Sequence, residues 1–213
     1  AAQITGPTKP RRWEAPRAPD ADVEAADPDT PRGSMRRAPK AEAKPAPRKP
    51  AATRAEQLDQ LYARLAKAKD GAEAQGVSLR IERLLARSSS DTANLLMGRA
   101  LTAAAHDEKL VAEDLIDRIL ELEPNWAEAW TRRAALRAGR DDVSGAVGDF
   151  AQALKIEPRH IGALSGLGFL MLRIERRDEA LRALNKALEL NPFLEPAKKV
   201  AAKLAAERGG QAL

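Results

Sequence analysis

The residues that could do catalytic or metal chemistry are few and scattered in this chain. Cysteine is absent, which excludes disulfides, thiolate nucleophiles and cysteine metal sites. The two histidines, His106 and His160, have no second histidine or carboxylate at metal-binding spacing, so we expect capping or surface roles for them. No nucleotide-binding glycine loop, nucleophile elbow or HExxH pattern is present in the sequence. We therefore expect no catalytic residues, no metal site, no cofactor and no enzymatic activity.

Two arginines stand 34 positions apart, each directly before an alanine: Arg99 and Arg133. Both could bind an anion. A structural role is the stronger interpretation, because arginine suits partly buried ion pairs. We expect each arginine to span its helix pair and to meet an acidic residue such as Asp114 or Asp149.

Trp126 and Trp130 are four residues apart, a spacing that brings side chains together on one helix. Trp130 belongs to a repeating column of large apolar residues, so we expect it in the core. Trp126 lies at the very start of the helix, where either a core position or a binding platform is compatible with the sequence.

The elements that must position these residues begin near residue 52, where the composition changes. Residues 1–52 hold ten of the fourteen prolines and no Leu, Phe or Tyr, so they cannot bury enough apolar area to offset the entropy of ordering. They carry 11 Lys and Arg against 7 Asp and Glu, net +4, and the remainder carries 25 against 24, net +1, for a total of +5. We predict a disordered, proline-rich basic tail over 1–52 and a folded domain over 53–213.

The tail allows several functions. It could be a spacer or a second partner-binding segment, with Trp13 as its anchor. A basic disordered segment could also bind nucleic acid through phosphate neutralisation, or an anionic membrane or wall surface. Against nucleic acid, Trp13 is the tail's one aromatic residue for stacking, and an acidic island at residues 20–29 interrupts the positive charge.

Apolar residues follow helical spacing from Glu56 onward. A turn signal at Asp70-Gly71 separates two amphipathic patterns, and together they predict a helical hairpin over 55–87. The pattern residues are Leu58, Leu61, Tyr62 and Leu65, then Val77, Ile81, Leu84 and Leu85. No apolar run approaches the roughly 18 residues of a membrane-spanning helix, so we expect no transmembrane segment.

A period of 34 residues organises the rest of the chain. Seven columns of small, large apolar or proline residues keep this step, which predicts three copies of a unit that buries its apolar faces by stacking. Among them are Ala100, Ala134 and Gly168; Ala112, Ala146 and Ala180; Ile116, Phe150 and Leu184; and Pro124, Pro158 and Pro192.

This pattern resembles the tetratricopeptide repeat family. The resemblance implies an all-α fold, a right-handed superhelical solenoid of antiparallel helix pairs. Its expected parts are repeats at about 93–124, 127–158 and 161–192, a degenerate leading hairpin at 55–87 and a cap helix at 195–208. Arg99 and Arg133 depart from the leucine that is usual at their place, and Glu175 stands where glycine is common.

The resemblance also implies a binding surface, a concave groove that the first helices line and that usually holds a partner peptide. The places carried over as inward-facing are Asn94, Met97, Leu101, Glu128, Thr131, Arg132, Ala135, Ser165, Phe169 and Leu172. One branch of the family holds C-terminal carboxylates there with Lys, Asn and Arg. Met97, Leu101 and Ala135 occupy those places here, which argues against a carboxylate clamp.

We therefore predict a non-enzymatic scaffold or adaptor that grips a protein or peptide partner in the groove. The alternative is a tether to nucleic acid or an anionic envelope surface that depends on the tail, with a structural solenoid. The segment 157–168 is similar to short exported bacterial proteins of the family, and the sequence begins at Ala1 without Met. Signal cleavage and trimming would both explain that start. We expect a periplasmic location, with the cytoplasm as the alternative.

Overall fold

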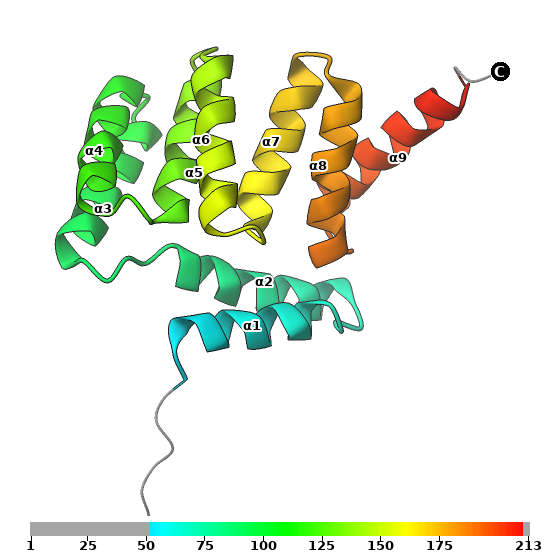
Figure 1. The fold of residues 1–213 in the computed structure, drawn as a ribbon, viewed down its shortest axis with the longest axis horizontal. Coiled ribbons are helices and arrows are strands. Elements are labelled where there is room, and N and C mark those ends of the chain that lie inside the picture. Colours follow the sequence, from blue (N-terminus) through cyan, green and yellow to red (C-terminus); the bar gives the residue numbers. More distant parts are fainter. Residues whose placement is uncertain (1–51, 211–213) are drawn as a thin grey trace, which may run out of the picture. The chain divides into compact units, whose positions relative to one another are not determined.

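The computed structural model describes residues 52–210, and within them the chain forms nine helices and no strand (Figure 1). The predicted all-α fold is confirmed. The predictions for the tail and for Trp13 lie outside these residues. The helices are α1 (Arg54–Leu65), α2 (Gly71–Leu85), α3 (Asp91–Ala105), α4 (Lys109–Leu122), α5 (Ala127–Ala138), α6 (Val143–Ile156), α7 (Ile161–Arg173), α8 (Arg177–Leu190) and α9 (Glu195–Gly210).

Side-chain caps determine where several helices begin. Thr53 and Glu56 form a capping box at the start of α1. Asp70 and Ser90 accept backbone amide hydrogens at the starts of α2 and α3. His160 caps α7 in the same way through its ring, so the expected capping role of this histidine is confirmed.

A residue in the left-handed conformation turns each repeat from its first helix to its second. Asp107, Asp141 and Glu175 have φ of 62°, 62° and 61°, and they stand 34 positions apart. The amide that follows each turn residue donates to a carbonyl near the helix end, as Glu108 does to Ala103 at 2.9 Å. Glu175 therefore keeps the turn geometry for which glycine is the easier residue.

The three repeats are helix pairs that stack on one another through the residues that recur every 34 positions. The pairs are α3 with α4, α5 with α6, and α7 with α8. Ala112, Ala146 and Ala180 are fully buried. The small column is needed for close packing: a Cβ added at Gly168 would lie 2.7 Å from two side-chain atoms of Leu184.

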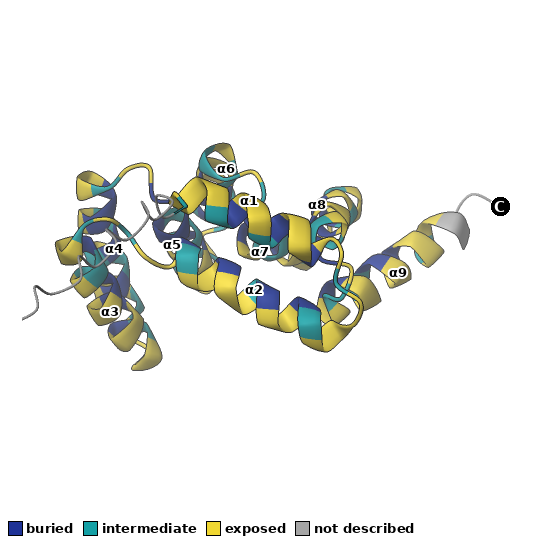
Figure 2. Ribbon diagram, turned by 90° about the horizontal axis from the view of Figure 1, so that it is seen from below, coloured by how far each residue is buried: buried dark blue, intermediate teal, exposed yellow. Residues whose placement is uncertain are grey.

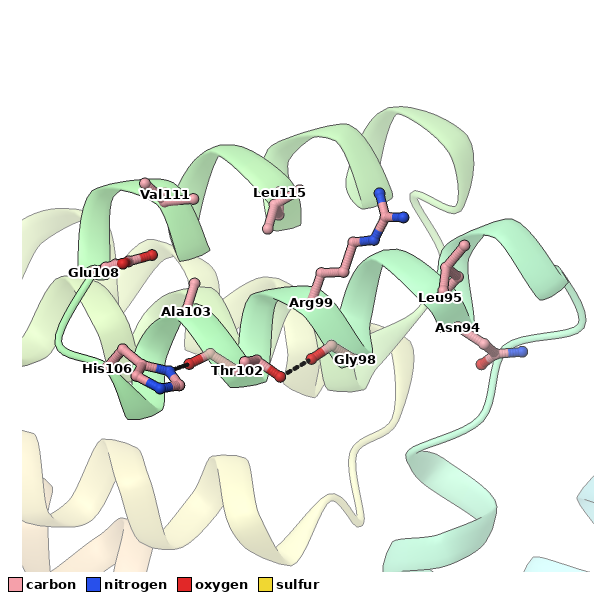
Figure 3. A pocket seen from close by; sticks show the side chains of 10 residues that line it. All are labelled: Asn94, Leu95, Gly98, Arg99, Thr102, Ala103, His106, Glu108, Val111 and Leu115. Carbon is pink, nitrogen blue, oxygen red and sulfur yellow. Dashed lines mark hydrogen bonds between the residues drawn. The ribbon is translucent and has the colours of Figure 1, made fainter.

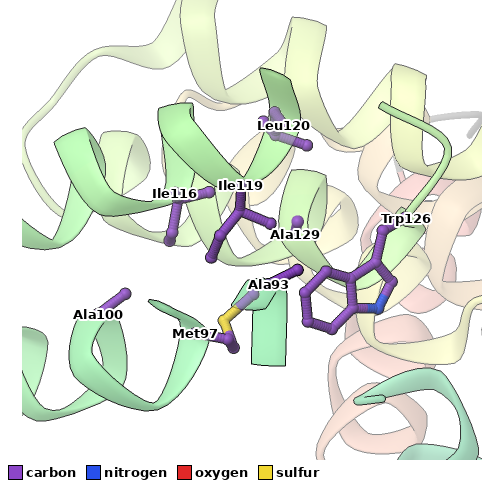
Figure 4. Packing of buried hydrophobic residues seen from close by; sticks show 8 residues of the cluster. All are labelled: Ala93, Met97, Ala100, Ile116, Ile119, Leu120, Trp126 and Ala129. Carbon is purple, nitrogen blue, oxygen red and sulfur yellow. The ribbon is translucent and has the colours of Figure 1, made fainter. Parts of the chain in front are cut away.

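Each repeat contributes to the core of its neighbour. Figure 4 shows Met97 of α3, Ile119 of α4 and Ala129 of α5 in one cluster, with Trp126 closing it. Trp130 packs against this cluster as a partly buried residue. At the other end of the stack, α9 buries its apolar residues on the third repeat. Ala197, Ala201 and Leu204 are buried there.

The leading hairpin does not continue the stack. Instead, α1 and α2 run crosswise under the ends of α5 to α8, as Figures 1 and 2 show from two directions. Their apolar faces form one cluster. Ile161 at the start of α7, Leu190 at the end of α8 and Phe193 after α8 pack against it. The first repeat is consequently not covered by the element that precedes it in the chain.

Within residues 52–210, no helix combines the length and apolar character that crossing a membrane requires.

Candidate functional site

A pocket of about 530 Å³ opens between α2 and the first helices of the second and third repeats. Its α2 wall combines the apolar Leu79, Ile81 and Leu85 with the polar Ser78, Glu82 and Arg83. Ile161 and Leu194 add apolar surface from the repeat junctions. The α5 wall contains Glu128, Thr131, Arg132 and Ala135.

Hydrogen bonds from the repeat-joining segments hold α2 in place as this wall. The buried indole of Trp126 donates from Nε1 to the backbone carbonyl of Leu85 at 2.8 Å. The Nδ2 atom of Asn191 lies 3.0 Å from Oγ of Ser78, in the middle of the helix. Trp126 is therefore neither simply a core residue nor a binding platform. Its indole N–H binds the leading hairpin to the repeats through this hydrogen bond.

The pocket has a buried charged group at Glu128. Its Oε1 accepts from Nε of Arg132 at 2.6 Å, and its Oε2 lies 3.0 Å from Nε2 of His160. Because Nδ1 of His160 accepts the amide hydrogen of Ala163 at 3.2 Å, the ring proton lies on Nε2 and is donated to Glu128.

These contacts determine the charge of the carboxylate. Burial alone would raise the pKa of Glu128, but the hydrogen bond from His160 and the positive charge of Arg132 lower it below its ordinary value. Glu128 is therefore an anion that is already neutralised within the protein. The arrangement orders α5 and the start of α7, and it leaves the apolar walls as the main surface for a ligand.

The four groove residues predicted in the second repeat, Glu128 to Ala135, all line this pocket together with Gly162. Leu101 and Phe169 are exposed, and Ser165 is half-buried. Asn94 has another role: its side chain accepts from the amide of Ser88 and donates to the carbonyl of Ser88, both at 2.9 Å.

The prediction is wrong for one groove residue, Met97. Met97 is only 5% exposed and lies in the core between α3, α4 and α5 (Figure 4). Leu172 is half-buried and packs against the cluster that α9 completes with Leu204, and its place in the groove stays a prediction. The flexible apolar side chain of Met97 gains more from a neighbouring helix than it would on an open surface.

The interpretation of the paired arginines holds for one of them. Arg133 binds Asp149 at 2.8 Å and Asp117 at 2.5 Å, and it lies over the Trp130 ring at 4.6 Å from the centroid. Arg99 is exposed, and no ion pair links it to Asp114 or to another carboxylate among residues 52–210.

The contribution of α2 to the pocket escaped sequence analysis. The signal that could have revealed it is the surplus of apolar residues at the repeat junctions. Ile161 and Phe193 stand 34 positions after Ala127 and Arg159, and both pack against the hairpin.

Comparison with known proteins identifies the family. No family model matches the chain, but it is 33% identical over 137 residues to a TPR repeat-containing protein of Rhizobium etli. The match covers 64% of this chain and 67% of that protein. The chain therefore belongs to the tetratricopeptide repeat family.

Solved structures agree on the fold. The first TPR domain of Spaghetti (RPAP3), bound to an HSP90 peptide, matches with a TM-score of 0.54 at 19% identity, over 57% of this chain and 96% of that one. The TPR2B domain of yeast Sti1, in a complex with pHsp70, matches with a TM-score of 0.52 at 15% identity, over 55% and 99%. At these identities the likeness concerns the helical-repeat fold alone.

Proposed function

We propose that this chain is a non-enzymatic interaction scaffold that holds a segment of a partner protein in the pocket between α2, α5 and α7. The observation that carries the proposal is the convergence of four inner-face residues of one repeat with an apolar wall from the leading hairpin. The peptide complexes formed by structurally similar domains support this use of the fold.

The walls indicate what kind of segment fits. Leu79 is a large apolar residue with 45% of its surface exposed, and Ile161 and Leu194 continue the same apolar surface. Because the positive charge of Arg132 balances Glu128, and His160 donates a hydrogen bond to it, the pocket offers little uncompensated charge at its base. The partner segment should therefore carry an apolar side chain as its anchor, and its binding should depend little on salt.

Displayed random peptides selected on the full chain would test this proposal. Peptides that bind should lose affinity for Ala135→Trp, in which a bulky side chain fills the pocket from an exposed position. The matched control is Ala202→Trp, an exposed alanine of α9 outside the pocket. Fluorescence anisotropy measures both affinities. Peptides that bind the two variants equally well would place the binding surface elsewhere.

We propose that the tail is a spacer or a second partner-binding segment. We also propose that the protein is located in the periplasm. The alternative function is a tether to nucleic acid or an anionic envelope surface that depends on the tail's net charge of +4. Binding of the full chain to single-stranded DNA or to anionic lipid vesicles would favour the alternative if affinity fell steeply with salt. Periplasmic and cytosolic fractions probed for the native protein test the location.

A further inference from the structure

The end of the stack that faces away from α9 exposes large apolar side chains. We define the front face by Leu95, Arg99, Thr102, Val111 and Leu115, which line a hollow of about 690 Å³ along α3 and α4 (Figure 3). Leu95 is 58% exposed and Val111 is 50% exposed. The α1–α2 hairpin, which would cover this face in a continuous stack, packs under the repeat junctions instead.

The repeats themselves indicate what covers such a face. In the second repeat, Ala129 and Leu136 stand 34 positions after Leu95 and Thr102, and both pack in the core that α4 of the preceding repeat forms. In the third repeat the equivalents are Ala163 and Leu170, which pack against Phe150 of α6. Twice in this chain, therefore, the second helix of a neighbouring repeat covers the surface that the first repeat leaves open.

The positive charge of Arg99 indicates which kind of residue the covering helix should carry. Arg133, the equivalent of Arg99, donates to Asp117, which belongs to the covering helix α4. It also binds Asp149 of its own repeat, whereas Leu115 stands at the equivalent place in the first repeat. Arg99 therefore lacks the acidic residue that its own repeat would supply, and a covering helix could provide one here as α4 does for Arg133.

We propose that the front face binds an amphipathic helix of a partner protein that carries an acidic residue opposite Arg99. The helix would extend the stack by one element and bury the side chains of Leu95 and Val111. Thr102 presents no unsatisfied donor to it, because its hydroxyl already donates to the carbonyl of Gly98 at 3.0 Å. The surface is separate from the pocket of the proposed function and does not depend on it.

The probe is a cross-linked helical peptide with the sequence of α4, residues 109–122, because α4 performs this covering role on the second repeat. Fluorescence anisotropy with the full chain should give saturable binding. Leu95→Asp should weaken it by about tenfold or more, since a charge would enter the apolar contact. Leu122→Asp is the matched control, because Leu122 is 55% exposed on α4 and does not line the hollow.

A charge exchange tests the acidic partner. Arg99→Glu in the chain should weaken binding of the α4 peptide, and a peptide carrying Asp117→Lys should restore binding to that variant. Unchanged melting curves for Leu95→Asp would show that the fold is retained. Absence of peptide binding, or binding indifferent to Leu95→Asp, would overturn the proposal. Sedimentation that finds a dimer, converted to monomer by Leu95→Asp, would also overturn it in favour of a second copy of this chain.

Discussion

The phenol of Tyr62 donates a 2.5 Å hydrogen bond to the backbone carbonyl of Arg159, which lies 97 positions later in the chain. The Arg159 guanidinium lies over the same ring at 4.5 Å from its centroid, and it pairs with Asp59 at 2.7 Å. These contacts hold α1 against the turn between α6 and α7. The position of the hairpin, and with it one wall of the pocket, depends on contacts of this kind.

Tyr62 should ionise well above the ordinary tyrosine pKa of about 10. Burial raises the pKa of this phenol, the nearby Glu157 raises it further, and Arg159 opposes the shift in part. Because Tyr62 is the only tyrosine, the ultraviolet absorbance of its phenolate can be followed directly. Its contribution to stability should be complete below about pH 10 and should be lost as the pH rises toward the folded-state pKa. If Tyr62 ionised at the ordinary pKa under native conditions, this result would contradict the docked hairpin. The pKa of Tyr62 in the denatured protein provides the reference value.

Trp126→Phe should loosen the hairpin without unfolding the repeats. The substitution removes the donor to the Leu85 carbonyl, a buried bond whose loss should cost about 1 kcal/mol. Amides of α1 and α2 should then exchange with deuterium faster than those of α7 and α8. Trp130→Phe is the control, since its indole donates to the Pro124 carbonyl at an exposed site. Equal effects of both variants on the exchange rates of α2 would argue against a specific role for the hydrogen bond between Trp126 and Leu85.

Glu128→Gln should make the stability of the protein less dependent on acid. The folded-state pKa of Glu128 is lowered, so its ionised form stabilises the fold above about pH 4.3, and this contribution disappears as the pH falls through the folded value. The wild type should exceed Glu128→Gln in unfolding free energy at neutral pH, and the gap should narrow below about pH 4. Urea unfolding at both pH values measures the gap. The exposed Glu121→Gln should show no such narrowing.

Gly168→Ala and Gly148→Ala should have opposite effects on stability. Both glycines lie inside helices, where alanine is favoured by about 1 kcal/mol. At Gly148 an added Cβ meets nothing within 4 Å, so the full gain is expected. At Gly168 it would lie 2.7 Å from Leu184, a fully buried side chain with little freedom to move, and overpacking should outweigh the gain. Thermal unfolding measures both, and a stabilised Gly168→Ala would mean that α7 and α8 can move apart.

The sequence by itself determined the helical repeats. The 34-residue step in Ala112, Ala146 and Ala180 implies close helix crossings, and these alanines are fully buried. Periodic patterns of this kind report on faces that meet between neighbouring elements, so they can be recognised from spacing alone. The resemblance to the tetratricopeptide repeat family, rather than spacing, implied the inner-face residues of the second repeat, which line the pocket.

Only the tertiary structure decided where the leading hairpin lies and which apolar side chains remain open. The apolar face of α1 and α2 has helical spacing that suits a regular repeat equally well. The position of the hairpin depends on single long-range hydrogen bonds, Tyr62 to Arg159 and Trp126 to Leu85. Local sequence patterns do not reveal such contacts. This position left Leu95 exposed on the front face, whereas packing among α3, α4 and α5 placed Met97 in the core. The physical reason is that spacing along a helix specifies which side chains share a face, whereas the surface that covers this face depends on competition among all faces of the folded chain.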